Sequence, residues 1–204
     1  GCEVYVAPRG RTRFQKVHEF DSSFHHLVLL CRNEEGYRNL SYMVSQAFLE
    51  GFYIKPRIDM DLLREHAGGL IACSACLGGE VPKLLAAGDY DKAKEVALEM
   101  RELFGADGYY LELQDHGIPV QRQVNGGLLR LHEETGINLI ATNDAHYLRR
   151  EDAEMQDILM CIQMGKTVGD PNRMKFETEE FYVKTEAEMA ALFPNYPEAL
   201  ENTV

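Results

Sequence analysis

Asp144 and His146 are a pair of residues whose types and spacing suggest metal chemistry. They follow the apolar run Leu139–Thr142, and side chains two residues apart on an extended segment share one face. If the strand continues through Asp144, a carboxylate and an imidazole project together from its end, which suits a single metal ion. The alternative is a helix cap, in which Asn143 or Asp144 accepts hydrogen bonds from the next helix. The residue types leave both interpretations open.

Cys73 and Cys76 form a C-x-x-C motif at the end of another apolar run. A redox pair normally opens a helix, whose amide dipoles stabilise the thiolate, but Cys73 lies at the end of a predicted strand. A structural zinc site needs a second pair of ligands at short spacing, and the sequence has none. Cys73 is therefore expected to be a core residue. Cys76, which precedes a Gly-Gly turn, is placed where a ligand would be exposed.

Glu3 and His26 are the remaining candidates for metal binding. Glu3 lies in a run of apolar residues, so its carboxylate must be paired, bound to metal or turned to water. His25 and His26 open a strand on which only one of them can face inward, and such a histidine is often a hydrogen-bonded core residue. His116 could equally be a turn residue. A hydrolytic metal cluster, mostly at strand ends, is predicted from Glu3, one or two of these histidines, one cysteine and the pair Asp144 and His146.

Short apolar runs that alternate with helical patterns indicate how these residues are positioned. The alternation predicts an α/β fold with a largely parallel sheet, either open or closed into a barrel, whose functional groups gather beyond the carboxyl ends of strands. The predicted strands are Glu3–Ala7, His26–Cys31, Leu70–Ser74, Tyr109–Leu113 and Leu139–Thr142. The predicted helices are Asn33–Leu49, Asp89–Phe104, Val120–Thr135 and Arg150–Ile162.

Charge and cysteine usage limit the classes of function. The 33 acidic and 21 basic residues give a net charge of −12, which repels phosphate backbones, and the one tight basic cluster is Arg9, Arg11 and Arg13. We therefore expect DNA to be held mainly by regions outside this chain. Five irregularly spaced cysteines suit a reducing cytoplasm. No run approaches the roughly 18 apolar residues that a membrane helix needs.

Both ends of the sequence predict a fragment of a longer protein. The first residues, Gly1–Val6, already have the pattern of a strand, and a helix that opens at Pro197 has only about two turns before Val204. The polar segment Lys166–Phe181 is predicted to be a connecting loop. We therefore predict one domain over residues 1–165, followed by a connection over residues 166–204 that leads toward a further region.

Several blocks of the sequence resemble a known family, in order and with similar spacing. They are "GCEVYVAPRGR", "HHLVLLCRNEEGYRNL", "EGFYIKPRID", "SACLGGEVPKLL", "YYLELQDHGIPVQ", "ATNDAHYL", "DILMCIQMGKT" and "FPNYPEALENT". Together they resemble the polymerase-and-histidinol-phosphatase (PHP) domain, in the version found in bacterial DNA polymerase III alpha subunits. The resemblance covers essentially the whole chain.

The resemblance implies a fold and a set of ligands. The family fold is a distorted seven-stranded β/α barrel with divalent metal ions, zinc, manganese or magnesium, at one mouth. At matching positions the implied ligands are Glu3, His26, Cys76, Asp144 and His146, whereas Cys73 falls where the family usually has an aliphatic residue. His26 lies at the start of its strand, and the sequence does not explain how it reaches that mouth.

One motif of the family is missing from the sequence. The family's first motif, a His-x-His, would precede Gly1, so the barrel is expected to be incomplete at its N-terminus. We expect the 204-residue chain alone to bind metal weakly and to hydrolyse nothing efficiently. Tight stoichiometric zinc or manganese binding in calorimetry would contradict this.

The resemblance also implies a role in DNA replication. The nucleotide-transferring aspartates of the polymerase would lie beyond Val204. This domain would either proofread by metal-dependent 3′→5′ exonuclease action or dock a proofreading exonuclease subunit, beside other subunits of the polymerase III holoenzyme.

Two alternatives to this function remain. One is a stand-alone phosphoesterase that acts on a small substrate such as histidinol phosphate. The other is a non-catalytic structural and docking module.

Overall fold

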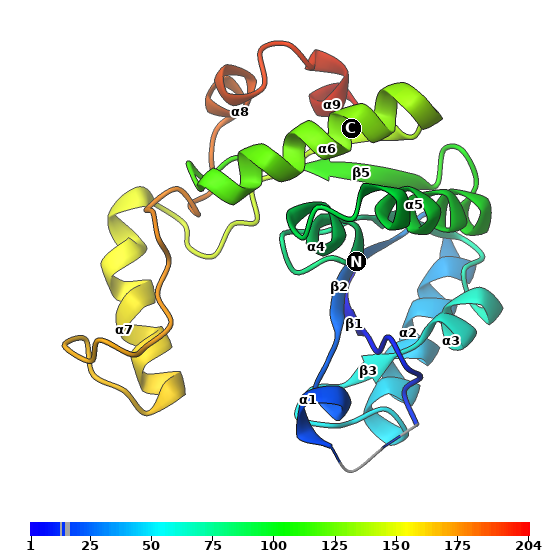
Figure 1. Cartoon of the computed structure of the whole chain (residues 1–204), viewed down its shortest axis with the longest axis horizontal. Helices are drawn as coiled ribbons and strands as arrows, with labels where there is room; N and C mark the ends of the chain where they lie inside the picture. The colour runs from blue at the N-terminus through cyan, green and yellow to red at the C-terminus, as the bar shows by residue number, and fades with distance from the viewer. Residues whose placement is uncertain (13, 15–16) are drawn as a thin grey trace.

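The computed structural model describes residues 1–12, 14 and 17–204, so Arg13 lies outside the described residues. Strands and helices alternate up to residue 141, apart from two successive helices between residues 80 and 104, and only helices follow in the rest of the described chain (Figure 1). All five predicted strands are present, each within one residue of its predicted bounds. The strands are β1 (Cys2–Val6), β2 (His25–Cys31), β3 (Arg57–Ile58), β4 (Leu70–Cys73), β5 (Tyr109–Leu113) and β6 (Asn138–Ala141).

The four predicted helices are present as well, and shorter ones lie between them. The helices are α1 (His18–Asp21), α2 (Glu34–Leu49), α3 (Met60–Glu65), α4 (Glu80–Ala86), α5 (Tyr90–Phe104), α6 (Pro119–Thr135), α7 (Ala153–Met164), α8 (Glu186–Leu192) and α9 (Pro197–Glu201), with a 3-10 turn, η1 (Arg150–Asp152), before α7. Local signals set their ends: Asp89 caps α5, whose C-terminal residue is followed by Gly105 at φ 84°.

The strands described by the structure form one mixed sheet in the order β3-β1-β2-β4-β5-β6. The neighbours β1–β3, β4–β5 and β5–β6 are parallel, whereas β2 is antiparallel to both β1 and β4. The expectation of a largely parallel sheet therefore holds except at β2, which runs opposite to every other strand. The α/β class is confirmed. The seven-stranded barrel is not, because β3 and β6 are the outer strands of this order.

The hydrophobic core lies between the sheet and the helices that contact it. Leu29 of β2, Leu111 of β5 and Leu139 of β6 are fully buried in one cluster with Met43 of α2 and Leu128 of α6. Because side chains alternate along a strand, Glu3 and His26 lie on the face opposite to their core neighbours. The core thus occupies one face and leaves the other for polar groups.

The segment after α7 packs back onto the sheet. Ala199 of α9 is fully buried, Phe193 is nearly so, and the Asn202 side chain donates to the Leu139 carbonyl of β6 at 2.8 Å. By contrast, α7 stands away from the sheet (Figure 1). A domain boundary at residue 165 stays a prediction. None of the helices in the described part of the chain combines the length and apolar character that crossing a membrane requires.

Candidate metal centre

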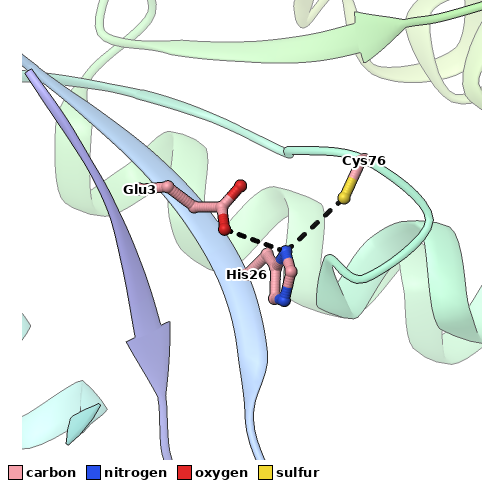
Figure 2. Close-up of side chains that lie close together, drawn as sticks. All are labelled: Glu3, His26 and Cys76. Carbon is pink, nitrogen blue, oxygen red and sulfur yellow. Dashed lines mark hydrogen bonds and ion pairs between the residues drawn. The ribbon is translucent and has the colours of Figure 1, made fainter. Parts of the chain in front are cut away.

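Glu3, His26 and Cys76 converge on one point (Figure 2). Nδ1 of His26 lies 3.2 Å from Oε1 of Glu3 and 3.5 Å from Sγ of Cys76. The three potential donor atoms all lie within 4.8 Å of one another. Glu3 is exposed and the other two are half-buried, so a small ion can reach the cluster from solvent.

The reversed direction of β2 explains how His26 reaches this cluster. Because β2 is antiparallel to β4, its first residues lie beside the turn that leaves the carboxyl end of β4. The His26 amide donates to the Gly78 carbonyl at 2.9 Å. On the other side of β2, Tyr5 of β1 pairs with His26. This pairing places Glu3 diagonally opposite His26, on the same face of the sheet.

The turn after β4 is shaped to fold over His26. Ala75 has a positive φ of 65°, and a Cβ added at Gly78 would lie 2.9 Å from the His26 ring. A larger residue at position 78 would therefore push the ring away from Cys76. The Gly78 amide also donates to Sγ of Cys76 at 3.4 Å. Glycine at position 78 thus allows the thiol and the imidazole to meet.

The three side chains also attract one another electrostatically. The hydrogen bonds to Cys76 and Glu3 raise the pKa of His26 to about 9, against the opposing effect of burial. At neutral pH the proton on His26 therefore supplies the positive charge of the cluster. A bound cation would take over that role once the proton leaves.

Cys73 does not belong to this site. Its side chain is only 2% exposed, and burial raises the pKa of its thiol to about 12. Both Cys73 and Cys76 are free thiols. The expectation that Cys73 is a core residue is confirmed. His25, beside His26, turns to Lys83 instead, with Nδ1 3.4 Å from Nζ.

Asp144 and His146 form a second pair, with Oδ1 and Nε2 3.5 Å apart. The premise that the strand continues through Asp144 is wrong, because β6 ends at Ala141. The two side chains meet in the loop that follows β6, where Asp144 takes a left-handed conformation with φ 43°. The helix-cap alternative is also wrong, since the next helical turn begins only at Arg150.

The structure places this pair outside the three-donor cluster but within its electrostatic influence. Burial raises the pKa of Asp144, but the hydrogen bond and the charge of His146 outweigh it, with smaller contributions from His116 and His26, so that the net shift is downward. The pKa of His146 is raised, chiefly by Asp144 and to a smaller extent by Glu3. The five implied ligands are thus a tight triad and a neighbouring pair.

A distant segment holds the loop that carries Asp144 and His146. The His146 amide donates to the Phe181 carbonyl at 2.7 Å, and the Asn143 side chain donates to the Tyr182 carbonyl. The Phe181 ring stacks on His116 with centroids 4.0 Å apart. These contacts cross more than 30 residues of sequence, so no local pattern could have predicted them.

The triad has the chemistry and spacing of a metal site. Carboxylate oxygen, imidazole nitrogen and thiolate sulfur all bind zinc, at metal–ligand distances of about 2.0–2.3 Å. Tetrahedral geometry at those distances separates neighbouring donors by about 3.3–3.8 Å. The separations of 3.2 Å and 3.5 Å around Nδ1 of His26 lie close to this range, and the donor atoms of Glu3 and Cys76 lie within 4.8 Å of each other.

Comparison with known proteins identifies the family. Residues 1–116, more than half of the chain, match the profile of the PHP domain. The chain belongs to the PHP domain family. A PHP chain is expected to depend on metal, and the triad supplies suitable donors at the position that the family resemblance implied.

Curated relatives of this PHP chain are named DNA polymerase III subunit alpha. The relatives from Treponema pallidum and Borreliella burgdorferi are 48% and 47% identical over 204 residues, which is 100% of this chain and 17% and 18% of theirs. The relative from Thermus aquaticus is 44% identical over 207 residues, with coverage of 100% and 17%. The PHP chain therefore spans less than a fifth of the length of these relatives.

Proposed function

We propose that this chain is the PHP region of a bacterial DNA polymerase III alpha subunit, and that the complete protein carries out DNA-directed DNA synthesis. The identity of 44–48% to alpha subunits across the whole chain supports this. It also weighs against a stand-alone phosphoesterase for histidinol phosphate. The proposed location is the cytoplasm, with other holoenzyme subunits as partners.

Within that protein, the proposed role of this region is metal-dependent 3′→5′ exonuclease proofreading. The observation that carries this proposal is the convergence of Glu3, His26 and Cys76 within 4.8 Å. Zinc, manganese or magnesium would be held by these three, with Asp144 and His146 as further ligands. The thiol favours zinc, because magnesium prefers oxygen donors.

The proposed ligands would have distinct roles in phosphodiester hydrolysis. When bound, the metal supplies Lewis acidity and lowers the pKa of a bound water. His26 must give up its proton to bind as a neutral imidazole, and Glu3 and Cys76 favour the charged form until then. Asp144 orients His146 through their contact at 3.5 Å. The acidic chain would leave most DNA contacts to other parts of the polymerase.

The experiment is Asp144→Asn in the full-length polymerase, with exonuclease and synthesis activities measured on the same preparation. The expected result is loss of exonuclease activity with normal synthesis. Asp61→Asn, at an exposed aspartate on α3, is the matched control and should change neither activity. Unchanged exonuclease activity in Asp144→Asn would reject the proposed role.

A second candidate function is docking of a separate exonuclease subunit. The exposed apolar side of α7 favours it, because Met155, Leu159 and Ile162 lie at helical spacing and are 60%, 58% and 70% exposed. Docking would be selected if the wild-type domain showed no exonuclease activity while Leu159→Arg abolished subunit binding. Retained binding in Leu159→Arg would reject this surface.

A further inference from the structure

Glu112 is a buried carboxylate near the carboxyl end of β5 that the metal triad does not include. It is 6% exposed, and burial raises the pKa of its carboxyl group while three hydrogen bonds oppose the shift. A buried carboxylate is costly unless its oxygens are well paired. The hydrogen-bond partners of Glu112 therefore show which parts of the structure this carboxylate holds.

The two carboxylate oxygens of Glu112 reach two different loops. Oε2 accepts from the Ala75 amide at 3.0 Å, one residue before Cys76. Oε1 accepts from the Thr142 hydroxyl, two residues before Asp144, and from the Gln114 side chain at 3.1 Å. One side chain thus ties the loop of the triad to the loop of the Asp144–His146 pair.

His116 makes a second connection from the same stretch of sequence. Its side chain is fully buried, and Nδ1 lies 2.7 Å from the Gln121 side-chain amide, which can only donate. Nδ1 is then the acceptor, so Nε2 carries the hydrogen and donates to the Asn143 carbonyl at 2.5 Å. The peptide bond between Asn143 and Asp144 is held in place by this contact.

Both contacts fall beside strained backbone. Ala75 and Asp144 have φ values of 65° and 43°, a conformation that costs non-glycine residues about 1–2 kcal/mol. Such residues persist when the surrounding structure fixes them. Glu112 holds the amide of Ala75, and His116 holds the carbonyl immediately before Asp144.

We propose that Glu112 and His116 are positioning residues, which fix the Cys76 loop and the Asp144 loop relative to each other so that both present their ligands to one metal centre. This inference rests on the proposed metal function. Glu112 couples the two loops, and His116 acts on the Asp144 loop alone.

The difference between the two residues makes the proposal testable. In Glu112→Gln, an amide nitrogen replaces one carboxylate oxygen. If the remaining oxygen keeps Thr142 and Gln114, the new donor faces the Ala75 amide, and the Cys76 turn loses its hydrogen bond. His116→Phe keeps a ring to stack on Phe181 but removes the donor to Asn143. The two variants should therefore disturb different ligands.

The experiment titrates the full-length protein with cobalt(II), whose absorption reports thiolate ligation. Glu112→Gln is expected to lower cobalt affinity about 10–100-fold, as loss of an outer contact commonly does, and to weaken or shift the thiolate absorption. His116→Phe should lower affinity with the thiolate absorption unchanged. The control is Asp59→Asn, a carboxylate that is also 6% exposed and also accepts from backbone amides, but at α3.

A role in stability alone would leave the folded fraction of each variant with wild-type affinity and spectrum, and that result would overturn the proposal. A second measurement needs no metal: the alkylation rate of Cys76 in metal-free protein, followed by mass spectrometry. It should rise several-fold in Glu112→Gln and stay unchanged in His116→Phe, and equal rates in all variants would also overturn the proposal. If wild type bound no cobalt but alkylation changed as expected, the metal function would fail and the positioning role would stand.

Discussion

The two parts of the candidate centre are built in different ways. Glu3 and His26 lie on paired strands, and the turn that carries Cys76 is bonded directly to β2, so sheet register fixes the triad. Asp144 and His146 lie on a loop beyond the outer strand β6, and that loop depends on Phe181 for its position. Ligands on one sheet are thus set by backbone pairing within the sheet, whereas ligands on a loop depend on a separate segment that packs against that loop.

The largest expected effect follows removal of the Phe181 ring, which is 5% exposed. Phe181→Ala should cost about 3 kcal/mol, the lower end for a buried phenylalanine. Hydrogen exchange at residues 142–147 should accelerate about 100-fold, while β1 and β2 stay protected. Phe193→Ala removes an equally buried ring elsewhere and should leave residues 142–147 unchanged. Equal acceleration in the triad strands would show that the two parts are not independent.

Zinc affinity should fall more when a residue of the triad is replaced than when a residue of the Asp144–His146 pair is replaced. His26→Asn removes the side chain that contacts both Glu3 and Cys76, so affinity should fall at least about 100-fold, the upper range for loss of an outer-shell contact. Asp144→Asn should cost less, about 10-fold, because the pair lies outside the triad. Competition with a chelator measures both. A larger loss in Asp144→Asn would reverse the proposed order of importance.

The lowered pKa of His116 predicts that the stability of the loop carrying Asp144 and His146 depends on pH. Burial lowers the pKa of His116 below its ordinary value of 6.5. The unfolded chain therefore binds a proton more readily than the folded one, and stability falls as the pH drops below about 6.5, by up to about 1.4 kcal/mol per pH unit. Hydrogen exchange at residues 142–147, corrected for intrinsic rates, should show this slope, and His116→Phe should flatten it. An identical slope in both proteins would assign the effect to other groups.

The smallest effect is expected from the ion pair between Arg150 and Glu180, which lies beside the Phe181 segment. Arg150 is more than half exposed, and such pairs contribute about 0.2–1 kcal/mol. Arg150→Ala should therefore change exchange at residues 142–147 no more than a few-fold. An effect as large as that of Phe181→Ala would mean that surface charge, and not ring packing, holds the loop.

Much of the fold could be predicted because its strands are marked by apolar runs. The short strand β3 (Arg57–Ile58) has no such run, and it forms by pairing with β1. The reversal of β2 leaves no trace in hydrophobic periodicity, although it decides where His26 lies. Strand existence is a local property, whereas direction depends on the whole chain.

In the candidate site, too, some residues could be identified from the sequence and others depend on contacts across the whole chain. The family resemblance implied Cys76 and His26, and the structure brings both to Glu3. Glu112 was missed, although the sequence held a signal: a carboxylate in an apolar strand must find partners, as was argued for Glu3. His116 could not be assigned, because its role depends on Asn143 and Phe181, residues 27 and 65 positions farther along the chain.

Anomalous X-ray diffraction at the zinc edge, from crystals of the full-length protein grown with zinc, is the most direct test of whether these side chains form one metal centre. The expected result is an anomalous peak within about 2.0–2.3 Å of the donor atoms of Glu3, His26 and Cys76, with Asp144 and His146 turned toward the same centre. A map with no peak there, or with a peak bound by other side chains, would contradict it.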